Sequence, residues 1–195
     1  MLKKGAMFGL DARIALAIFG ALSVISGAAL YSAIENAKVV QRVTSLSEAA
    51  KALESYLLDV GTLPPLHSTE GTVIDITKLI SSSEIGWKGP YLPYEAGDRW
   101  GHTDIALETP EYNTTVGSGM ALRMIQTTAG AFTLCTSGEN CTVWVSLLEQ
   151  DRALAKKIDE YVDGTVDKDS GNIRLSATTN YDNIWFNTGI RVDQF

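Results

Sequence analysis

The most uneven feature of the chain is a run of apolar residues near its start. Residues 14–34, IALAIFGALSVISGAALYSAI, contain no charged side chain over 21 positions. As an α-helix rising 1.5 Å per residue, this segment extends about 31 Å, close to the ~30 Å hydrocarbon thickness of a bilayer. The pattern therefore predicts a helix that can span a membrane.

A second pattern carries the helix beyond this run. Seven apolar residues recur at alternating steps of four and three, on one face of a helix: Val39, Val43, Leu46, Ala50, Leu53, Leu57 and Val60. Polar residues occupy the other faces: Asn36, Lys38, Gln41, Arg42, Glu48, Lys51 and Glu54. Gly61, followed by Pro64 and Pro65, predicts the helix end. The stripe covers only about three heptads, which favours packing against the chain's own head over a coiled-coil dimer.

The second half of the chain has the alternation typical of antiparallel strands. ALRMIQ (121–126), AFTLCT (131–136) and TVWVSLL (142–148) are separated by turn residues, and residues 172–195 supply one or two further strands. Residues 149–162 have helical spacing, with candidate apolar contacts at Leu147, Leu148, Leu154, Ile158 and Val162. We therefore expect an α+β fold, a long N-terminal α-helix packed on an antiparallel β-sheet head.

Composition and charge exclude some functions. The 195 residues carry a net charge of −7, and the basic residues form no patch that would neutralise a phosphate backbone, so we expect no nucleic-acid partner. Two histidines and two cysteines are too few for a four-ligand zinc site unless carboxylates complete it.

Three interpretations of the apolar segment remain open. Lys3 and Lys4 precede it and Glu35 follows it, so the positive-inside bias places the N-terminus in the cytoplasm and the rest outside. The segment could be a secretory signal cleaved after Ala29, or a plain uncleaved anchor. Asp11 and Arg13 suit neither interpretation well.

The third interpretation follows from the stretch KKGA-MFGLDARIALAIFGALS, which resembles the type IV pilin superfamily. Those proteins have a short basic leader, a small residue at the cut, and an apolar helix with one acidic residue, usually glutamate. The resemblance implies cleavage by a prepilin peptidase between Ala6 and Met7, which makes Asp11 the fifth mature residue. Cleavage after Gly5, the commoner family junction, would make it the sixth. Ala6 before the cut, aspartate for glutamate and Arg13 depart from the family pattern.

The resemblance implies a leader (1–6), a transmembrane and assembly helix (7–35), an amphipathic helix of the head (36–61) and a globular head (62–195). It also implies an assembly role for Asp11, because a desolvated carboxylate needs a neutralising partner. The freed α-amine of Met7 on a neighbouring subunit would be that partner. Arg13 is an alternative, although residues i and i+2 of a helix do not face each other. The simpler alternative is a helix-end charge favoured by the dipole.

A second resemblance narrows the family. The run Trp87-Lys88-Gly89-Pro90-Tyr91-Leu92 and the turn Asp98-Arg99-Trp100-Gly101 are similar to the head of type II secretion major pseudopilins, with Arg99 in place of the family's proline. The Gly-Pro turn is rigid, and Trp87, Tyr91 and Trp100 are large apolar side chains that can seal the loop onto the helix. The alternative is aromatic packing around a Gly-Pro turn of the kind open to any extracellular domain. The resemblance covers residues 1–106, and the longer second half is more like minor pilins.

Two further pairings are expected in the head. Outside the cytoplasm, Cys135 and Cys141 are expected to form a disulfide across a hairpin, the alternative being two buried thiols. Asp163, Asp167 and Asp169, on a Gly-bearing loop, are candidate calcium ligands, the alternative being a solvated acidic turn. The region that holds calcium in major pseudopilins is YNTTVGSG here and has no aspartate.

Enzyme motifs are absent from the sequence: there is no Gly-x-Ser-x-Gly, P-loop or His-Glu-x-x-His, and Gly117 and Gly119 do not open a helix. His67 beside Glu70 and His102 near Asp104 are expected to be surface loop residues.

We expect a non-catalytic subunit of a type II secretion pseudopilus or pilus-like filament. Its partners would be other such subunits, prepilin peptidase, the inner-membrane assembly platform and the membrane, with the head in the bacterial periplasm. The alternative is a monomeric membrane-anchored binding module.

Overall fold

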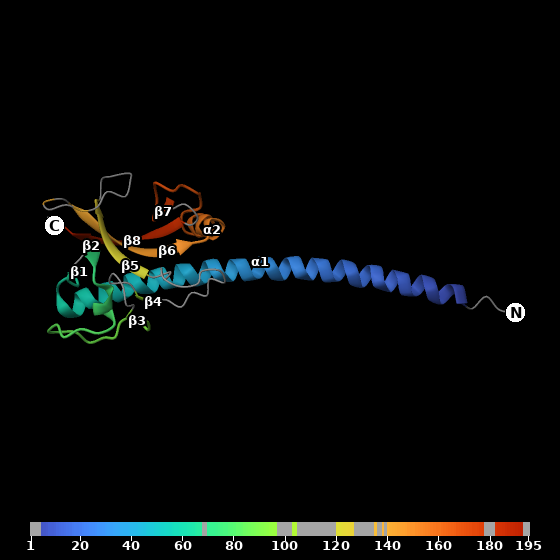
Figure 1. The fold of residues 1–195 in the computed structure, drawn as a ribbon, viewed down its shortest axis with the longest axis horizontal. Coiled ribbons are helices and arrows are strands. Elements are labelled where there is room, and N and C mark those ends of the chain that lie inside the picture. Colours follow the sequence, from blue (N-terminus) through green and yellow to red (C-terminus); the bar gives the residue numbers. More distant parts are fainter. Residues whose placement is uncertain are drawn as a thin grey trace. The chain divides into compact units, whose positions relative to one another are not determined.

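The protein has two compact units, residues 1–38 and residues 39–195. The computed structural model describes residues 5–67, 70–96, 103–104, 120–126, 135, 138, 140–177 and 182–192. Figure 1 shows its elements.

Helix α1 (Gly5–Val60) runs for 56 residues without a break. It ends where the sequence predicted, because Gly61 takes a positive φ of 84° and its N–H donates to the carbonyl of Leu57 over 2.9 Å. A left-handed glycine of this kind closes the last turn of a helix at little steric cost.

The head is built on an antiparallel sheet, which confirms the α+β prediction. Its main path runs in the order β1 (Leu66–His67), β2 (Glu70–Ile74), β5 (Met120–Gln126), β6 (Cys141–Gln150), β8 (Asp182–Val192) and β7 (Ile173–Ala177). The short strands β3 (Glu95–Ala96) and β4 (Thr103–Asp104) pair with each other, and β4 joins the sheet through β5. A 3-10 turn, η1 (Ile76–Leu79), follows β2. The predicted strands 121–126 and 142–148 thus lie within β5 and β6, and the described part of residues 172–195 supplies β7 and β8. Residues 131–136 fall outside the described residues except for Cys135.

One hydrophobic core joins the second half of α1 to one face of the sheet. Alternate strand residues point into it, because side chains alternate across a strand: Leu122, Met124, Val143, Val145, Leu147, Ile173, Leu175 and Ile184. Leu46, Leu53 and Tyr56 of α1 are fully buried against them. The core therefore fixes the last six turns of α1 to the head.

The buried face of α1 is rotated from the predicted stripe. Its centre follows Val39, Arg42, Leu46, Ala49, Leu53 and Tyr56, while the predicted Val43, Ala50, Leu57 and Val60 are only partly buried. The placement of Arg42 on a solvent face is therefore wrong, since its side chain is only 7% exposed. The small Ala49 and Ala52 allow close approach on this face, and Arg42 finds a polar partner on the sheet.

Helix α2 (Arg152–Asp163) begins three residues later than predicted. The carboxylate of Asp151 accepts hydrogen bonds from the N–H groups of Ala153 (2.9 Å) and Leu154 (3.0 Å), which caps the helix at that point. Leu154 and Ile158 are buried as expected, but Leu147 and Leu148 belong to β6. Gly164, with φ 76°, ends the helix.

The opposite face of the sheet carries a second, smaller cluster of Trp144 and Trp185. The guanidinium of Arg174 lies 4.8 Å from the Trp144 ring centroid, and that of Arg123 lies 5.8 Å from the Trp185 ring centroid. Such cation–π contacts suit arginine on a face that also buries large aromatic rings.

Candidate functional site

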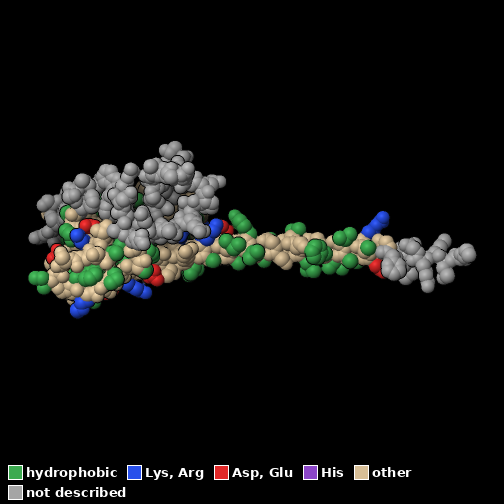
Figure 2. All heavy atoms as spheres, turned by 60° about the horizontal axis from the view of Figure 1, so that its bottom comes forward, with side chains coloured by type: hydrophobic (Ala, Val, Ile, Leu, Met, Phe, Trp, Pro, Cys, Tyr) green, Lys and Arg blue, Asp and Glu red, His purple; other side chains and the backbone are tan. Residues whose placement is uncertain are grey.

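The first candidate site is the apolar surface of α1 in the first unit. Its large side chains are exposed along its length, including Leu16 at 70% and Phe19 at 71%. Among the described residues one helix is long and apolar enough to cross a membrane, by length and composition, and none of its most apolar window is buried. Figure 2 shows these green side chains along the N-terminal half of α1. An apolar surface of this size needs lipid or other protein helices as its surroundings.

The predicted processing and assembly residues lie at the start of this helix. Gly5 is its first residue, and Ala6 and Met7 follow within it. Asp11 and Arg13 are both exposed, and within the described part of the chain neither takes part in an ion pair. The structure therefore leaves the Asp11 carboxylate accessible to an external partner, and it does not pair it with Arg13.

The second candidate site joins the loop of residues 81–93 to the last turns of α1. The rings of Trp87 and Tyr91 meet edge to face with centroids 5.9 Å apart, and Tyr91 meets Tyr56 of α1 in the same way at 6.0 Å. The Trp87 indole N–H donates to the carbonyl of Lys78 over 3.1 Å. These T-shaped pairs are the favoured geometry of aromatic rings, so the loop is held by specific contacts.

Asp59 is the polar centre of this arrangement, which we call the head clamp (Asp59, Lys88 and Tyr91). One carboxylate oxygen accepts from the ammonium of Lys88 over 2.8 Å, and the other accepts from the Tyr91 hydroxyl over 2.9 Å. The same hydroxyl accepts from the backbone N–H of Lys88 over 2.9 Å, so it is satisfied as donor and as acceptor. These hydrogen bonds, chiefly that from Lys88, hold the pKa of Asp59 below its usual value, and Asp59 raises the pKa of Lys88.

Two glycines make the clamp sterically feasible. Gly86 has φ 95°, and a Cβ there would lie 2.4 Å from the carbonyl oxygen of Asp59. A Cβ on Gly89 would lie 2.7 Å from the Trp87 ring and 2.9 Å from Tyr91, and the Gly89–Pro90 bond is cis. Of the predicted motif, Trp87, Gly89, Pro90 and Tyr91 thus lie together. Asp98, Trp100 and Gly101 fall outside the described residues.

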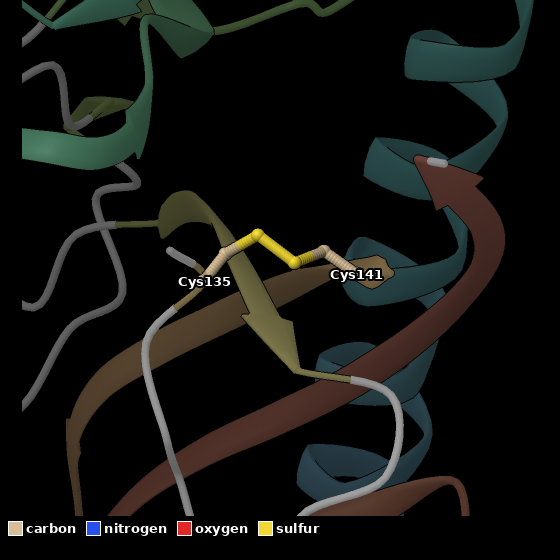
Figure 3. The surroundings of a disulfide bond; sticks show 2 residues. All are labelled: Cys135 and Cys141. Atoms are coloured by element: carbon tan, nitrogen blue, oxygen red, sulfur yellow. A yellow bond between two sulfur atoms is a disulfide. The ribbon is translucent and has the colours of Figure 1, made fainter. Parts of the chain in front are cut away.

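The predicted disulfide is present between Cys135 and Cys141, whose Cα atoms are 6.0 Å apart. Cys141 is the first residue of β6, and the N–H of Cys135 donates to Met124 of β5 over 3.2 Å. Figure 3 shows the bridge beside these strands. Both cysteines are buried, so the bridge is part of the core.

The three candidate calcium ligands each have another role. Asp163 accepts from the backbone N–H groups of Asn172 (3.1 Å) and Ile173 (2.7 Å), at the start of β7. Asp167 accepts from the Asp169 N–H and the Ser170 hydroxyl, and Asp169 pairs with Lys168. Over the described ranges no three His, Cys, Asp or Glu side chains are grouped so that they could hold a metal ion. The geometry is that of a loop ordered by its own hydrogen bonds.

Asp159, which the sequence analysis did not select, is the buried acid beneath this loop. It is fully buried on the inner side of α2, and one of its oxygens accepts from the Asp167 N–H over 2.9 Å. Burial raises the pKa of Asp159 to about 6; the Asp167 hydrogen bond opposes this, and the charges of Asp163 and Asp167 add to it. An aspartate between two buried positions of an amphipathic helix was the available signal.

Arg42 and Gln150 form a second buried polar contact that the sequence analysis missed. The Nε of Arg42 donates to the side-chain oxygen of Gln150 over 3.2 Å, and the Gln150 amide donates to the Leu148 carbonyl over 2.7 Å. Burial lowers the pKa of Arg42. No local pattern pairs residues that are 108 positions apart.

The histidine pairs stay outside any catalytic arrangement that the described residues show. His67 and Glu70 are register partners of β1 and β2, Asp104 lies in β4, and His102 is outside the described residues.

No protein-family model, curated protein or solved structure matches the chain.

Proposed function

We propose that this chain is a non-catalytic subunit of a pilus-like filament, closest in kind to a type II secretion pseudopilus. The N-terminal helix would insert the subunit into the bacterial inner membrane, with the head in the periplasm. Prepilin peptidase would remove residues 1–6, and the inner-membrane assembly platform would add the subunit to the filament.

The observation that carries the proposal is the combination of an exposed apolar segment in the first half of α1 with a single accessible acid just before it. Residues 14–34 carry no charge, while Asp11 is exposed just before them. A plain anchor needs the apolar length but has no use for a carboxylate just before it. A filament gives the carboxylate a partner, the α-amine that leader removal creates on the neighbouring subunit.

Assembly would exchange lipid contacts for helix–helix contacts. Because lipid tails are as apolar as leucine, the gain comes from close packing and polar pairing between helices. Gly20 and Gly27 suit this environment, since a Cβ at either position would meet nothing within 4 Å and close approach is therefore open on those sides. The proposed work of the protein is polymerisation.

Leader removal gives the first test. Ala6→Trp should block cleavage, because a bulky side chain replaces the small residue at the proposed cut. Mass spectrometry of the membrane-extracted protein should show the full-length chain for Ala6→Trp and a mass lacking the leader for the wild type. Ala12→Trp is the matched control and should be processed normally. If Ala6→Trp is still processed to the wild-type mature mass, the side chain at position 6 does not control the cut. If the mature mass differs from that of the wild type only by the substitution, cleavage occurs after Gly5. Either result would contradict cleavage between Ala6 and Met7. Absence of processing in the wild type would favour a plain anchor.

Electron microscopy of cells that overproduce the chain with its assembly genes tests polymerisation. Filaments that label with antibody to the head support the proposal. A purely dispersed membrane signal would instead support the monomeric membrane-anchored binding module.

A further inference from the structure

The exposed side of α2 has an uneven distribution of charge. Its basic residues, Arg152, Lys156 and Lys157, all lie in the first half of the helix and are exposed. Glu160 and Asp163 occupy its last turn. In a chain of net charge −7, three basic residues within six consecutive positions therefore share the exposed side of one helix.

This order of charges is the reverse of what stabilises a helix. The N-terminal turn of a helix favours acids and the C-terminal turn favours bases. In α2 the first turn has no acid after the cap and the last turn has no base. The dipole of α2 therefore does not account for the placement of these basic residues.

The basic end of α2 lies at the point where α1 enters the head. Asp151, the cap of α2, follows Gln150 directly, and Gln150 contacts Arg42 near the start of the head unit. Arg152 also bonds to this end of the sheet, with its Nε 3.3 Å from the Asp182 carboxylate. Arg42 lies only eight positions after Ile34, the last residue of the apolar segment. Eight residues extend about 12 Å as a helix and at most about 28 Å in any conformation.

We propose that the basic end of α2 docks on anionic phospholipid headgroups at the surface of the membrane that holds α1. This inference rests on the proposed membrane insertion and adds a partner for the head. Headgroups lie within reach of the basic end because the chain leaves the hydrocarbon so close to Arg42. The charges are complementary, whereas the acidic last turn of α2 and the Asp167–Asp169 loop would be repelled. The basic end thus orients a head of negative net charge against a negative surface.

The test uses the full-length chain, one copy per lipid nanodisc, with a fluorophore on Ala153→Cys. The native cysteines form a disulfide, so the introduced thiol is the only reactive one. Ala153 is exposed beside the basic residues. Discs contain phosphatidylcholine alone or phosphatidylcholine with phosphatidylglycerol, and a quencher attached to a few headgroups reports approach of α2 to the surface.

Quenching should be strong with phosphatidylglycerol and weak without it. Each basic residue near an anionic surface contributes about fivefold to binding, so Lys156→Gln/Lys157→Gln should reduce the docked-to-undocked ratio on the order of thirtyfold. The control Lys51→Gln/Lys78→Gln makes the same change in net charge elsewhere on the head and should quench like the wild type. Raised salt should weaken docking in the wild type.

Equal quenching with and without phosphatidylglycerol would overturn the proposed docking. So would a Lys156→Gln/Lys157→Gln variant that is quenched like Lys51→Gln/Lys78→Gln. A charge dependence that occurs only in discs holding two copies would also overturn it and assign the surface to a neighbouring subunit. Retention of the chain by the discs is measured in the same samples. A retained chain with no docking refutes this inference alone, whereas a chain that the discs do not retain refutes the membrane insertion as well.

Discussion

At the scale of single residues, Gly86 shows how closely the loop of residues 81–93 approaches α1. Its φ of 95° disfavours any side chain, and a Cβ would lie 2.4 Å from the Asp59 carbonyl oxygen, a backbone atom that cannot move aside. We expect Gly86→Ala to lower the free energy of unfolding by about 2–5 kcal/mol, the sum of a left-handed backbone and an overpacked contact. Urea denaturation of the detergent-solubilised chain measures it.

Gly61 supplies the matched control for this prediction. It has a similar φ of 84°, but nothing lies within 4 Å of its Cβ position. Gly61→Ala should therefore cost only the backbone term, about 1 kcal/mol. Equal losses for the two variants would show that the loop does not press on α1.

Asp159 gives a prediction about pH. Its folded-state pKa of about 6 lies above the unfolded value of about 3.9, so the native protein holds the extra proton between these values. The contribution of Asp159 to stability is therefore fully present below about pH 4 and is lost as the pH rises through about 6.

The variant Asp159→Asn lacks this titration while keeping the shape of the side chain. From pH 4 to pH 7 the wild type should lose on the order of 1–3 kcal/mol of unfolding free energy relative to Asp159→Asn, allowing for solvent screening. Urea curves at several pH values give the difference. Parallel pH profiles for the two proteins would mean that the pKa of Asp159 is the same in the folded and unfolded states.

Residue-level prediction from sequence worked where the partner is near in the chain. Cys135 and Cys141 are six positions apart, and their bond was expected. The sequence did not single out Asp59, because its partners Lys88 and Tyr91 are 29 and 32 positions away. An aspartate near a helix end does not by itself indicate which distant residues it contacts.

At the scale of elements, the contact of α1 with β6 through Arg42 and Gln150 tests how the helix is held. Gln150→Leu leaves a buried guanidinium without this partner, and should cost about 2–3 kcal/mol, as for hydrogen bonds to charged groups. Arg42→Met removes the charge and leaves only a neutral oxygen unsatisfied, so it should cost about 1 kcal/mol.

The double variant Arg42→Met/Gln150→Leu should be close to the wild type, because replacing both members of a buried polar pair by apolar groups is often neutral. Chemical denaturation of the four proteins forms the double-mutant cycle. Additive losses would show that Arg42 and Gln150 do not act on each other.

Periodicity predicted the helices and strands well, but it predicted less well which face of α1 is buried. The end of α1 at Gly61 and the alternation in β5 and β6 follow from local backbone and side-chain preferences. The rotation of the buried face towards Arg42 and Tyr56 does not, because it is decided by close packing and by polar partners on the sheet. Hydrophobicity alone scores arginine as solvent-facing and takes no account of a glutamine across the core.

At the scale of the whole molecule, the assembly role of Asp11 is the decisive prediction. Asp11→Ala would leave the neighbour's α-amine without its partner in the filament core, at about 3–5 kcal/mol. In the membrane the amine lies near the aqueous interface, so insertion should be unaffected. The variant should be cleaved, inserted and folded in its head, yet fail to assemble.

Gel mobility follows cleavage, protease resistance follows folding of the head, and shearing of filaments from cells follows assembly. Asp11→Glu is the control and should assemble, because it keeps the charge with slightly longer reach. Wild-type assembly by Asp11→Ala would leave Asp11 as a helix-end charge only.

The class of the molecule was predictable, whereas its strand order was not. A long apolar helix followed by alternating strands leaves an α+β arrangement as the natural way to bury both. The order β5-β6-β8-β7, with the last two strands reversed along the sheet, depends on how α2 returns the chain. The path of the chain after α2 is set by contacts between residues distant in sequence, so hydrophobic periodicity cannot predict the strand order.

The redox state of Cys135 and Cys141 can report on which side of a membrane the head lies. Both cysteines of the chain are in this one bond, so a head exported as proposed would present no thiol. A head retained on the reducing side of the membrane would keep two thiols, because the bond forms in oxidising compartments. Alkylation of denatured whole-cell protein therefore counts the chains on each side: unmodified chains have crossed, and doubly modified chains have not. Under the proposed membrane insertion, the bond would therefore record on which side of the membrane the head of each chain lies.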